Sequence, residues 1–310
     1  MTETLFHAYT PLIVWTSLGL FICRFLPQWL PRFLGRGLYW IGVPLELFAL
    51  ARQSQLGNLN HEIGLPLIVP IITVATLLLG LMVVLPILWK FKEYSHAHAS
   101  FILAAVLGNT GFVGLAIAPF LINSEVLSWA VLYSITHNVI GPYGFGVVVA
   151  SYFSQSKAAN SWWIQLREVL TVPCLWAFLV GTLTQQVQFP QTIESGLQGC
   201  INVVIACAFL LTGIRLAQLQ GWKSIKPAFV AAIIKVCVIP LLVGVLTTWL
   251  LGLSGDRRLA MVLMSGMPSA FAGLILAEEY NLDRDLIASS IIISTVLLLL
   301  MLPLWILLFG

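Results

Sequence analysis

The sequence predicts an all-α membrane protein whose ten transmembrane helices form two inverted repeats of five helices each. Three observations lead to this prediction: the composition, a motif that occurs once in each half, and an alternation of basic charge between loops. Hydrophobic residues make up 59% of the 310 residues and charged residues only 9%. Because a soluble domain carries roughly 25% charged residues, most of this chain is expected to lie in the lipid bilayer.

Ten apolar segments follow one another, each long enough to cross ~30 Å of hydrocarbon. They span residues 8–25, 34–52, 65–89, 98–122, 126–153, 164–186, 196–217, 227–252, 258–279 and 285–309. The N-terminus has neither a basic region nor a cleavage site, so the first segment is expected to be retained. The small net charge of +3 is spread over short loops, which argues against a nucleic-acid partner. The five cysteines form no CxxC pair, so we expect neither a disulfide framework nor a metal site.

The loops between these segments alternate in basic charge. One set holds eleven basic residues, namely Arg24, Arg32, Arg36, Lys90, Lys92, Lys157, Arg167, Arg215, Lys223, Lys226 and Arg284, and the other holds three, namely Arg52, Arg257 and Arg258. Basic residues accumulate in cytoplasmic loops. We therefore expect a multi-pass protein of the cell (inner) membrane with its first loop in the cytoplasm and both termini outside it. Five spans per half is an odd number, so the second half is expected to enter the membrane inverted.

The repeated motif reads GFVGLAIA at residues 111–118 and AFAGLILA at residues 270–277, an offset of 271 − 112 = 159 residues. VLPIL at 84–88 matches VIPLL at 238–242 with an offset of 240 − 86 = 154, and Pro142 and Pro303 lie 303 − 142 = 161 apart. These offsets are close to half of the chain. We therefore divide the chain into a first repeat, residues 1–155, and a second repeat, residues 156–310.

The motif lies near the middle of the fourth and ninth segments. Alignment of the repeats places Asn109 at the position of Pro268, each about 15–17 Å into its segment at the helical rise per residue. Gly111 and Gly114 permit backbone angles that other residues avoid, and Pro268 lacks an N–H group. Each feature is expected to interrupt its helix. An interrupted helix is tolerated in hydrocarbon only where protein or a water-filled cavity satisfies the freed groups.

Half-helix N-termini at such interruptions carry partial positive charge and free N–H donors, which suit a carboxylate. We therefore expect an anionic substrate to meet Asn109 and Thr110 in the first half, and Met267, Pro268 and Ser269 in the second. The alternative is that these small residues only allow close packing of helices.

Several stretches closely resemble the auxin efflux carrier family of permeases. They are GNTGFVGL, MPSAFAGLILAEEYNLDRDLIASS and STVLLLLMLPLWILL, together with VPLELFAL, HNVIGPYGFGV and LLTGIRLAQ along the rest of the chain. The resemblance implies ten spans in two inverted repeats, a fold shared with bile acid sodium symporters, and broken helices four and nine that cross. It further implies a scaffold of spans 1, 2, 6 and 7 and a moving core of spans 3–5 and 8–10. Known substrates of the family are small organic acids, and the compact length is that of its prokaryotic members.

One position departs from the family pattern. The first motif commonly has proline where this chain has Ala116, and the nearest proline is Pro119. The interruption in the fourth segment is therefore expected to depend on Gly111 and Gly114.

Two ionisable residues lie deep in their segments, where a charge costs several kcal/mol and function is the default hypothesis. Glu46 is about 18 Å and Lys235 about 12 Å from the cytoplasmic side by helical rise. Either the two pair and bridge scaffold to core, or Lys235 extends towards the cytoplasm. For Glu46 two further alternatives are a static, protonated and hydrogen-bonded packing group, and the carrier of a coupling proton.

His137 and Asn138 lie near the midplane in the fifth segment. His137 either carries a proton, binds the substrate or makes an interhelical hydrogen bond. Asn138 occupies a position where the family often has asparagine, and it is the stronger candidate for the substrate site.

These features predict a permease that moves a small organic anion by alternating access, in an elevator-like manner, as a secondary active or facilitative transporter. Proton coupling, sodium coupling and no coupling all remain open, and no cofactor is expected. The ten segments contain no HExxH motif and no paired aspartates, so we do not expect an enzyme. The alternative is a membrane-embedded sensor or subunit with a degenerate transporter fold. Related folds also suggest a homodimer formed through the scaffold.

Overall fold

The computed structural model describes residues 2–27, 29–53, 65–89, 95–153, 173–218 and 224–310. Within these ranges every regular element is a helix, and one isolated antiparallel β-bridge joins Gly108 to Ser269. The start of the predicted sixth span, residues 164–172, lies outside the described residues, as do Lys90, Lys92, Lys157, Arg167 and Lys223.

The helices of the first half are α1 (Thr2–Ile22), the 3-10 turn η1 (Cys23–Phe25), α2 (Leu30–Gly37), η2 (Leu38–Gly42), α3 (Val43–Gln53), α4 (Leu65–Leu88), α5 (Ser95–Val106), η4 (Thr110–Gly114), α6 (Leu115–Leu121), α7 (Leu127–Ile140), η5 (Gly141–Gly146) and α8 (Val147–Phe153). Those of the second half are α10 (Pro173–Leu183), α11 (Gln191–Gln218), α12 (Ile225–Ile233), η6 (Ile234–Val238), α13 (Ile239–Leu251), α14 (Gly255–Ser265), α15 (Phe271–Glu279) and α16 (Arg284–Phe309). The segments η2, η4, η5 and η6 are π-helical turns.

Each of the ten predicted ranges contains helix. Among the described residues, five helices are long and apolar enough to cross a membrane by themselves: Phe33–Arg52, Ile68–Leu88, Gln191–Gln218, Ile225–Leu251 and Arg284–Phe309. The described part of the chain is therefore all-helical with several membrane-spanning candidates, and the count of ten spans stays a prediction.

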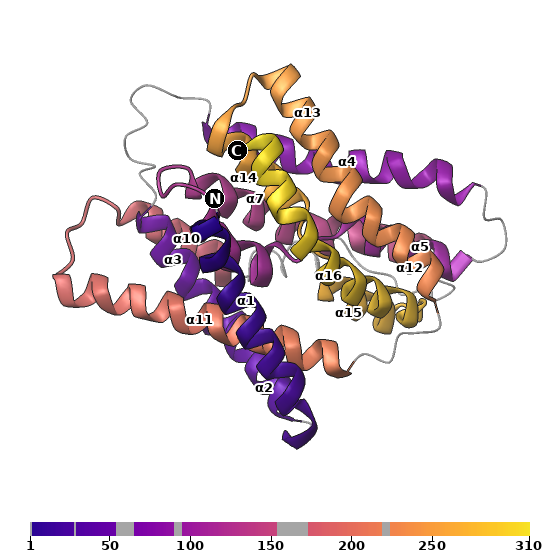
Figure 1. Ribbon diagram of the computed structural model, residues 1–310, viewed down its shortest axis with the longest axis horizontal. Coiled ribbons are helices and arrows are strands. Elements are labelled where there is room, and N and C mark those ends of the chain that lie inside the picture. The colour runs from indigo at the N-terminus through magenta and orange to yellow at the C-terminus, as the bar shows by residue number, and fades with distance from the viewer. Residues whose placement is uncertain (1, 28, 54–64, 90–94, 154–172, 219–223) are drawn as a thin grey trace.

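The helices separate into two groups, which we call the outer group and the crossing group (Figure 1). The outer group consists of α1, α2, α3, α10 and α11, in which α1 packs along α11 and α3 along α10. The crossing group consists of α4 to α8 and α12 to α16, in which α12 packs along α16, α13 along α14, and α4 along α7. The groups touch where α1 meets α6, where α3 meets α7, and where α11 meets η4.

Two glycines bring α1 and α11 into backbone contact. A Cβ atom at Gly19 would lie 2.2 Å from the carbonyl oxygen of Leu210, and one at Gly213 would lie 2.1 Å from that of Thr16. No side chain fits at either position, so the outer group depends on small residues for its closest helix contact.

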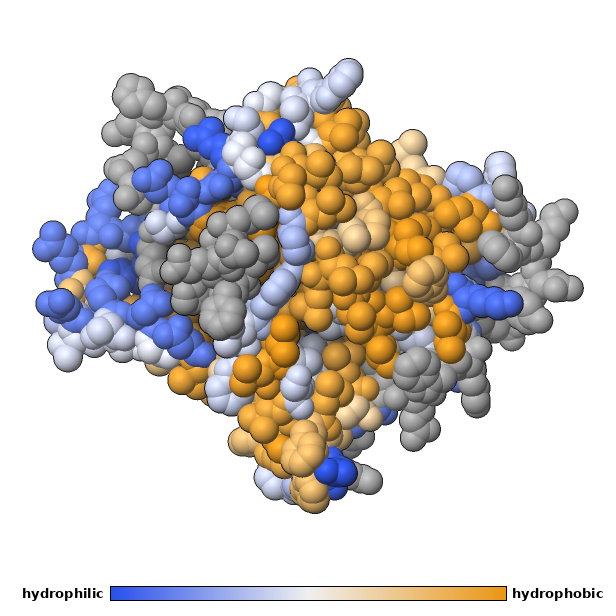
Figure 2. Space-filling view, in the orientation of Figure 1, coloured by the Kyte–Doolittle hydropathy of each residue, from blue (hydrophilic) through white to orange (hydrophobic). Residues whose placement is uncertain are grey.

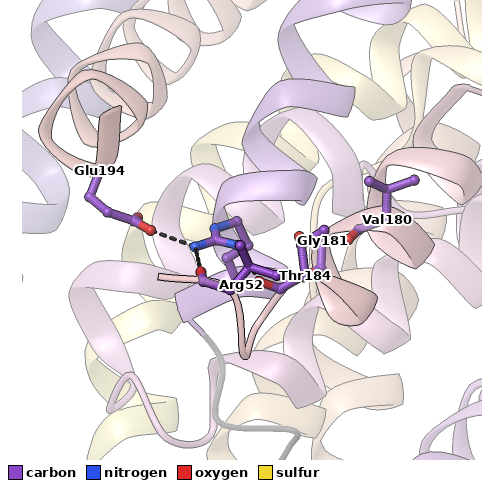
Figure 3. A network of polar contacts seen from close by, with 6 residues as sticks. Arg52, Val180, Gly181, Thr184 and Glu194 are labelled. Atoms are coloured by element: carbon purple, nitrogen blue, oxygen red, sulfur yellow. Dashed lines mark hydrogen bonds and ion pairs between the residues drawn. The ribbon is translucent and has the colours of Figure 1, made fainter. Parts of the chain in front are cut away.

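An arginine closes one end of the outer group (Figure 3). The Arg52 guanidinium at the end of α3 donates to the carbonyl oxygen of Thr184, to that of Val187 at 2.9 Å, and to Glu194 Oε1 at 2.6 Å. It also lies 3.7 Å from the ring centroid of Phe189. Since these partners lie between α10 and the start of α11, Arg52 fixes this connection to α3.

A wide apolar surface covers α13 and α16 (Figure 2). Large hydrophobic side chains exposed on these two helices are Leu241, Val245, Leu246, Trp249, Leu250, Leu251, Val296, Leu300, Leu304, Leu307 and Leu308. A soluble protein rarely exposes a contiguous apolar surface of this kind, so this face is suited to lipid.

Polar contacts assign helix ends to two opposite sides. At one side, Asn123 N after α6 donates to Asp256 at 3.0 Å, and Arg258 Nε donates to the Phe309 carbonyl at 3.0 Å. At the other, Ser224 Oγ before α12 donates to Asp283 before α16. This grouping agrees with the two predicted sets of loops, whereas the identity of the cytoplasmic side stays a prediction.

Candidate functional site

The first-half helix is interrupted at residues 107–109. Helix α5 ends at Val106 and the π-helical turn η4 begins at Thr110. Asn109 caps the new turn, because its Oδ1 accepts a hydrogen bond from the Phe112 amide at 3.3 Å. The predicted interruption is thus present, but it precedes Gly111 and Gly114, which lie inside η4. Ala116 lies in helical α6, so the missing proline does not prevent the break.

The second-half helix is interrupted at residues 266–270. Helix α14 ends at Ser265 and α15 begins at Phe271. Pro268 lies in the middle of this stretch, where its ring and missing N–H group oppose a continuous helix. This interruption also agrees with the prediction.

The two interruptions cross and pair by their backbones. The Asn109 amide donates to the Pro268 carbonyl at 2.7 Å, and the Ala270 amide donates to the Leu107 carbonyl at 3.0 Å. An offset of 161 residues relates the two hydrogen bonds, because 268 − 107 = 161 and 270 − 109 = 161. Leu107 therefore corresponds to Pro268, and Asn109 to Ala270. The motif phenylalanines Phe112 and Phe271 are related by a smaller offset, 271 − 112 = 159. In the second half Phe271 is the first residue of α15, whereas in the first half Thr110 and Gly111 of η4 precede Phe112.

The crossing lies inside the protein. Every residue from 101 to 110 and from 261 to 270 is buried. A Cβ atom at Gly108 would lie only 2.9 Å from Lys235 Cε and Nζ, so a side chain at this position would displace the end of Lys235. Freed backbone groups at such depth need partners from the protein.

Side chains from neighbouring helices supply these partners. His137 Nε2 on α7 accepts from the Gly108 amide at 3.3 Å, and Ser294 Oγ on α16 accepts from the Ser269 amide at 3.0 Å. The Ser269 hydroxyl donates to the Ala104 carbonyl at 2.7 Å. The interhelical hydrogen bond considered for His137 is therefore present, and it requires an unprotonated Nε2.

A polar cluster adjoins the first interruption. Asn138 Nδ2 lies 3.4 Å from Thr110 Oγ1 and 3.2 Å from Ser134 Oγ, and Ser134 Oγ lies 3.4 Å from Thr110 Oγ1. Thr110 and Ser134 are buried, whereas Asn138 is exposed. Asn138 is therefore the exposed member of the cluster.

The predicted site residues fall into two sets. Met267, Pro268 and Ser269 are enclosed in the crossing, and a Cβ atom at Gly114 would lie 3.0 Å from Met264 Cε. Gly111 is partly exposed beside Asn138, whose Nδ2 would lie 3.3 Å from an added Cβ. The structure therefore brings all eight together, but only Gly111 and Asn138 lie at an accessible edge.

Glu46 and Lys235 do not pair. Lys235 Nζ donates to the Ser265 carbonyl at 2.7 Å, and the residue is 1% exposed. Glu46 is 2% exposed, and its Oε1 has no hydrogen-bond partner in the described part of the chain. Neither alternative considered for Lys235, the bridge to Glu46 or an extension to the cytoplasm, is present, because its side chain reaches sideways to the crossing. Glu46 therefore remains a buried carboxyl group whose Oε1 has no partner among the described residues.

The elements that pack on α3 carry few groups able to face Glu46. Helix α7 carries Tyr133 and His137, whose ring centroids lie 6.2 Å apart, and α11 carries Cys200, Cys207 and Arg215 besides Glu194, which is paired with Arg52. Within the described residues no cation pairs with Glu46.

The two motif phenylalanines face the outer group. Phe112 packs against a buried cluster formed by Leu38, Val204, Ala208 and Leu211. The ring centroid of Phe271 lies 5.0 Å from the guanidinium carbon of Arg215 on α11.

Sequence reasoning missed Ser134, Ser294 and Arg215. Ser134 and Asn138 are four residues apart on one helix face, which is a usable signal. Ser294 has no such signal because its partner, the Ser269 amide, lies in the second interruption, 25 residues away in the sequence. Arg215 was counted only as a loop charge.

Helices that are interrupted inside an apolar bundle and meet at the interruption are characteristic of membrane transporters. Comparison with known proteins agrees with this class. The chain matches the model of a family described as membrane transport protein over residues 39–306. It therefore belongs to this family, which is the auxin efflux carrier family that the sequence motifs resemble.

Relatives support the same class. The chain is 28% identical over 204 residues to an uncharacterised transporter of Methanothermobacter thermautotrophicus, with 66% of this chain and 65% of the relative covered. It is 24% identical over 272 residues to the uncharacterised transporter MJ1031 of Methanocaldococcus jannaschii, covering 86% and 85%. It is 24% identical over 225 residues to the uncharacterised transporter YfdV of Escherichia coli, covering 70% of each. The match spans just under two thirds of the first relative's length and more of the other two.

Proposed function

We propose that this membrane transport protein is a secondary transporter of a small organic anion that works by alternating access. The observation that supports the proposal most is the pairing of Gly108 with Ser269 between two interrupted helices. Half-helix N-termini at this depth carry partial positive charge. Among the described residues, the amides of Gly111, Phe271 and Ala272 have no protein acceptor, so they remain available to an anion.

The substrate is proposed to enter beside Asn138. Its amide group and the Thr110 and Ser134 hydroxyls supply hydrogen bonds, and the first turn of η4 supplies the backbone donor of Gly111. The residues enclosed in the crossing, Pro268 and Ser269, then act through backbone geometry.

The outer group is proposed as the scaffold, and the crossing group as the part that moves in an elevator-like step. Support comes from the apolar contact between Phe112 and the α11 cluster, which has few polar bonds to break when one group slides on the other. The ten-span count, the inverted repeats, the extracytoplasmic termini and a homodimer through the scaffold belong to the same proposal.

Glu46 is proposed to carry a coupling proton. A carboxylate buried without a partner is costly, and protonation removes the charge. Because α3 contacts α7 of the crossing group, a change in that contact during transport would change the surroundings of Glu46.

Flux measurements test the substrate assignment. Purified protein in proteoliposomes should transport at least one of a panel of radiolabelled mono- and dicarboxylates, and Asn138→Ala should reduce the rate at least tenfold. Asn202→Ala is the matched control, since Asn202 is exposed on α11 away from the cluster. Failure of the wild type to move any acid removes the proposed function, and equal rates in both variants remove the role of Asn138.

The coupling role has its own test. Glu46→Gln should flatten the dependence of flux on pH while leaving the protein folded. An unchanged pH profile assigns Glu46 to packing alone. The double reversal Glu46→Lys with Lys235→Glu should not rescue either single variant, because the two side chains do not meet.

A further inference from the structure

Arg215 occupies an unusual place between the two helix groups. It lies near the end of α11 in the outer group, and its guanidinium carbon is 5.0 Å from the centroid of the Phe271 ring. Phe271 is the first residue of α15, the half-helix that follows the second interruption. On the other side, a Cβ atom at Gly35 of α2 would lie 2.8 Å from Arg215 Nη2. The guanidinium is therefore held beside the amino end of α15.

The guanidinium has no acceptor among the described residues. The ion pairs of Arg52 with Glu194 and of Arg284 with Glu278 do not involve Arg215. Arg258, also partly buried, donates to the Phe309 carbonyl and to Thr248 Oγ1. Arg215 is only partly exposed, and a guanidinium offers five N–H donors. A partly buried cation whose donors have no partner in the described residues is a candidate to bind an anion.

The face of α11 that carries Arg215 also faces the crossing group. Leu211 precedes Arg215 by four residues and so lies on the same helix face. Leu211, with Val204 and Ala208, forms the cluster against which Phe112 packs. This face is therefore apolar opposite the first interruption and cationic opposite the second.

We propose that Arg215 binds the carboxylate of the transported anion and thereby determines selectivity for acids. The inference rests on the proposed transport function and names a residue of the outer group as part of the substrate site. The planar guanidinium can hold both carboxylate oxygens at once. Its cation–π contact with the Phe271 ring, 5.0 Å from the centroid, holds the guanidinium beside the amino end of α15. The substrate then touches both helix groups, which links its binding to their relative position.

A phospholipid phosphate offers similar oxygen atoms to a guanidinium. The two sources differ in where the anion comes from, so the experiment includes both a soluble acid and an anionic lipid. The structure favours the soluble acid, because Arg215 faces the first residue of α15 at the contact between the groups rather than the lipid-suited face of α13 and α16.

The test compares Arg215→Gln and Arg215→Lys with the wild-type protein. Succinate and phenylacetate serve as probes, with succinamide and phenylacetamide as uncharged controls, and binding is measured by the thermal shift of purified full-length protein. A probe that stabilises the wild type should bind Arg215→Gln about tenfold more weakly or worse, because bonds to a charged acceptor are lost. Arg215→Lys should fall between the two, since lysine keeps the charge without the fork.

Arg24→Gln is the matched control. Arg24 also lies over phenylalanine rings, 4.7 Å from the centroid of Phe21 and 4.9 Å from that of Phe25, but far from the interruptions in sequence and on an exposed turn. The Arg24→Gln variant should bind succinate and phenylacetate with the same affinity as the wild-type protein. Equal loss in this variant would attribute the effect to net charge and overturn the proposal.

The remaining outcomes are distinguishable. If Arg215→Gln binds and transports the acids as well as the wild type, Arg215 is not in the site although the transport function stands. If the variant loses only its response to phosphatidylglycerol in proteoliposomes, Arg215 is a lipid contact and the proposal is wrong. If the wild type neither binds nor moves any carboxylate, the proposed function fails and this inference fails with it.

Discussion

The two interrupted helices reach one backbone pairing through different residues. The stretch in the second half contains Pro268, whose ring opposes a helix whatever surrounds it. The stretch in the first half contains no proline and is held by the Asn109 cap and by His137 of another helix. The comparison teaches that the backbone pairing is the shared feature, while each half supports it with its own local chemistry. The first interruption should therefore be more sensitive to side-chain substitutions.

The largest effect is expected at the point where the two stretches touch. Gly108→Val places a branched side chain where Lys235 Cε and Nζ would lie 2.9 Å from its Cβ. Lys235 must then leave the Ser265 carbonyl, so an ammonium group stays buried without its acceptor. We expect a loss of about 3 kcal/mol in the free energy of unfolding and no transport. Unfolding in detergent and proteoliposome flux measure both.

Gly37→Val is the control for this substitution, since a Cβ at Gly37 would meet no atom within 4 Å. Wild-type stability of Gly108→Val would show that the crossing has room that the structure does not show.

The side chains that support the two interruptions, His137 and Ser294, should contribute differently to the free energy of unfolding. His137→Leu leaves the buried Gly108 amide without an acceptor and removes the stacking with Tyr133, and we expect a loss of about 2 kcal/mol. Ser294→Ala leaves the Ser269 amide unpaired, but Ser269 keeps its own bond to Ala104 and the adjacent Pro268 still opposes a helix. Its loss should be about 1 kcal/mol. Hydrogen exchange of the Gly108 and Ser269 amides checks the local effect, and equal losses would contradict the comparison.

Sequence patterns predicted the interruptions because their causes are local. Glycine, asparagine and proline inside apolar segments signal a break without knowledge of other helices. The matching depth of Asn109 and Pro268 also predicted that the breaks would meet. The position of the first break was displaced, because Gly111 and Gly114 serve the π turn and the contact with Met264 instead.

Contacts between helices were predicted less well. Depth along a helix gives the height of a residue but not the direction of its side chain, which is why a pair between Glu46 and Lys235 was considered. Lys235 instead reaches the crossing, and the support from Ser294 depends on a neighbour that no sequence spacing reveals. Arg215 was missed because basic residues near helix ends are ordinarily explained by membrane orientation.

The cap of the first half gives a smaller effect. Asn109→Ala removes the acceptor of the Phe112 amide, with an expected loss of about 1 kcal/mol in the free energy of unfolding. Asn109→Ser should recover most of the loss, since serine is also a good N-cap residue. Transport should follow the same order. If Asn109→Ala is fully active, neither the cap nor the Asn109 amide contributes to the site.

The smallest expected effect transfers this cap to the second half. Ala270 occupies the position related to Asn109 by the offset of 161, and it has the extended backbone of an N-cap residue, with φ −78° and ψ 140°, but no side-chain acceptor. Ala270→Ser should therefore gain about 0.5 kcal/mol in the free energy of unfolding, by accepting from an amide in the first turn of α15. Ala272→Ser, at the second residue of α15, should leave the free energy of unfolding unchanged. Because a cap acts locally, Ala270→Ser should also fail to rescue Asn109→Ala, so the effects of the two substitutions should add. Rescue would instead mean that the two half-helices share their stability through the crossing, and that the halves are less independent than their different chemistry indicates.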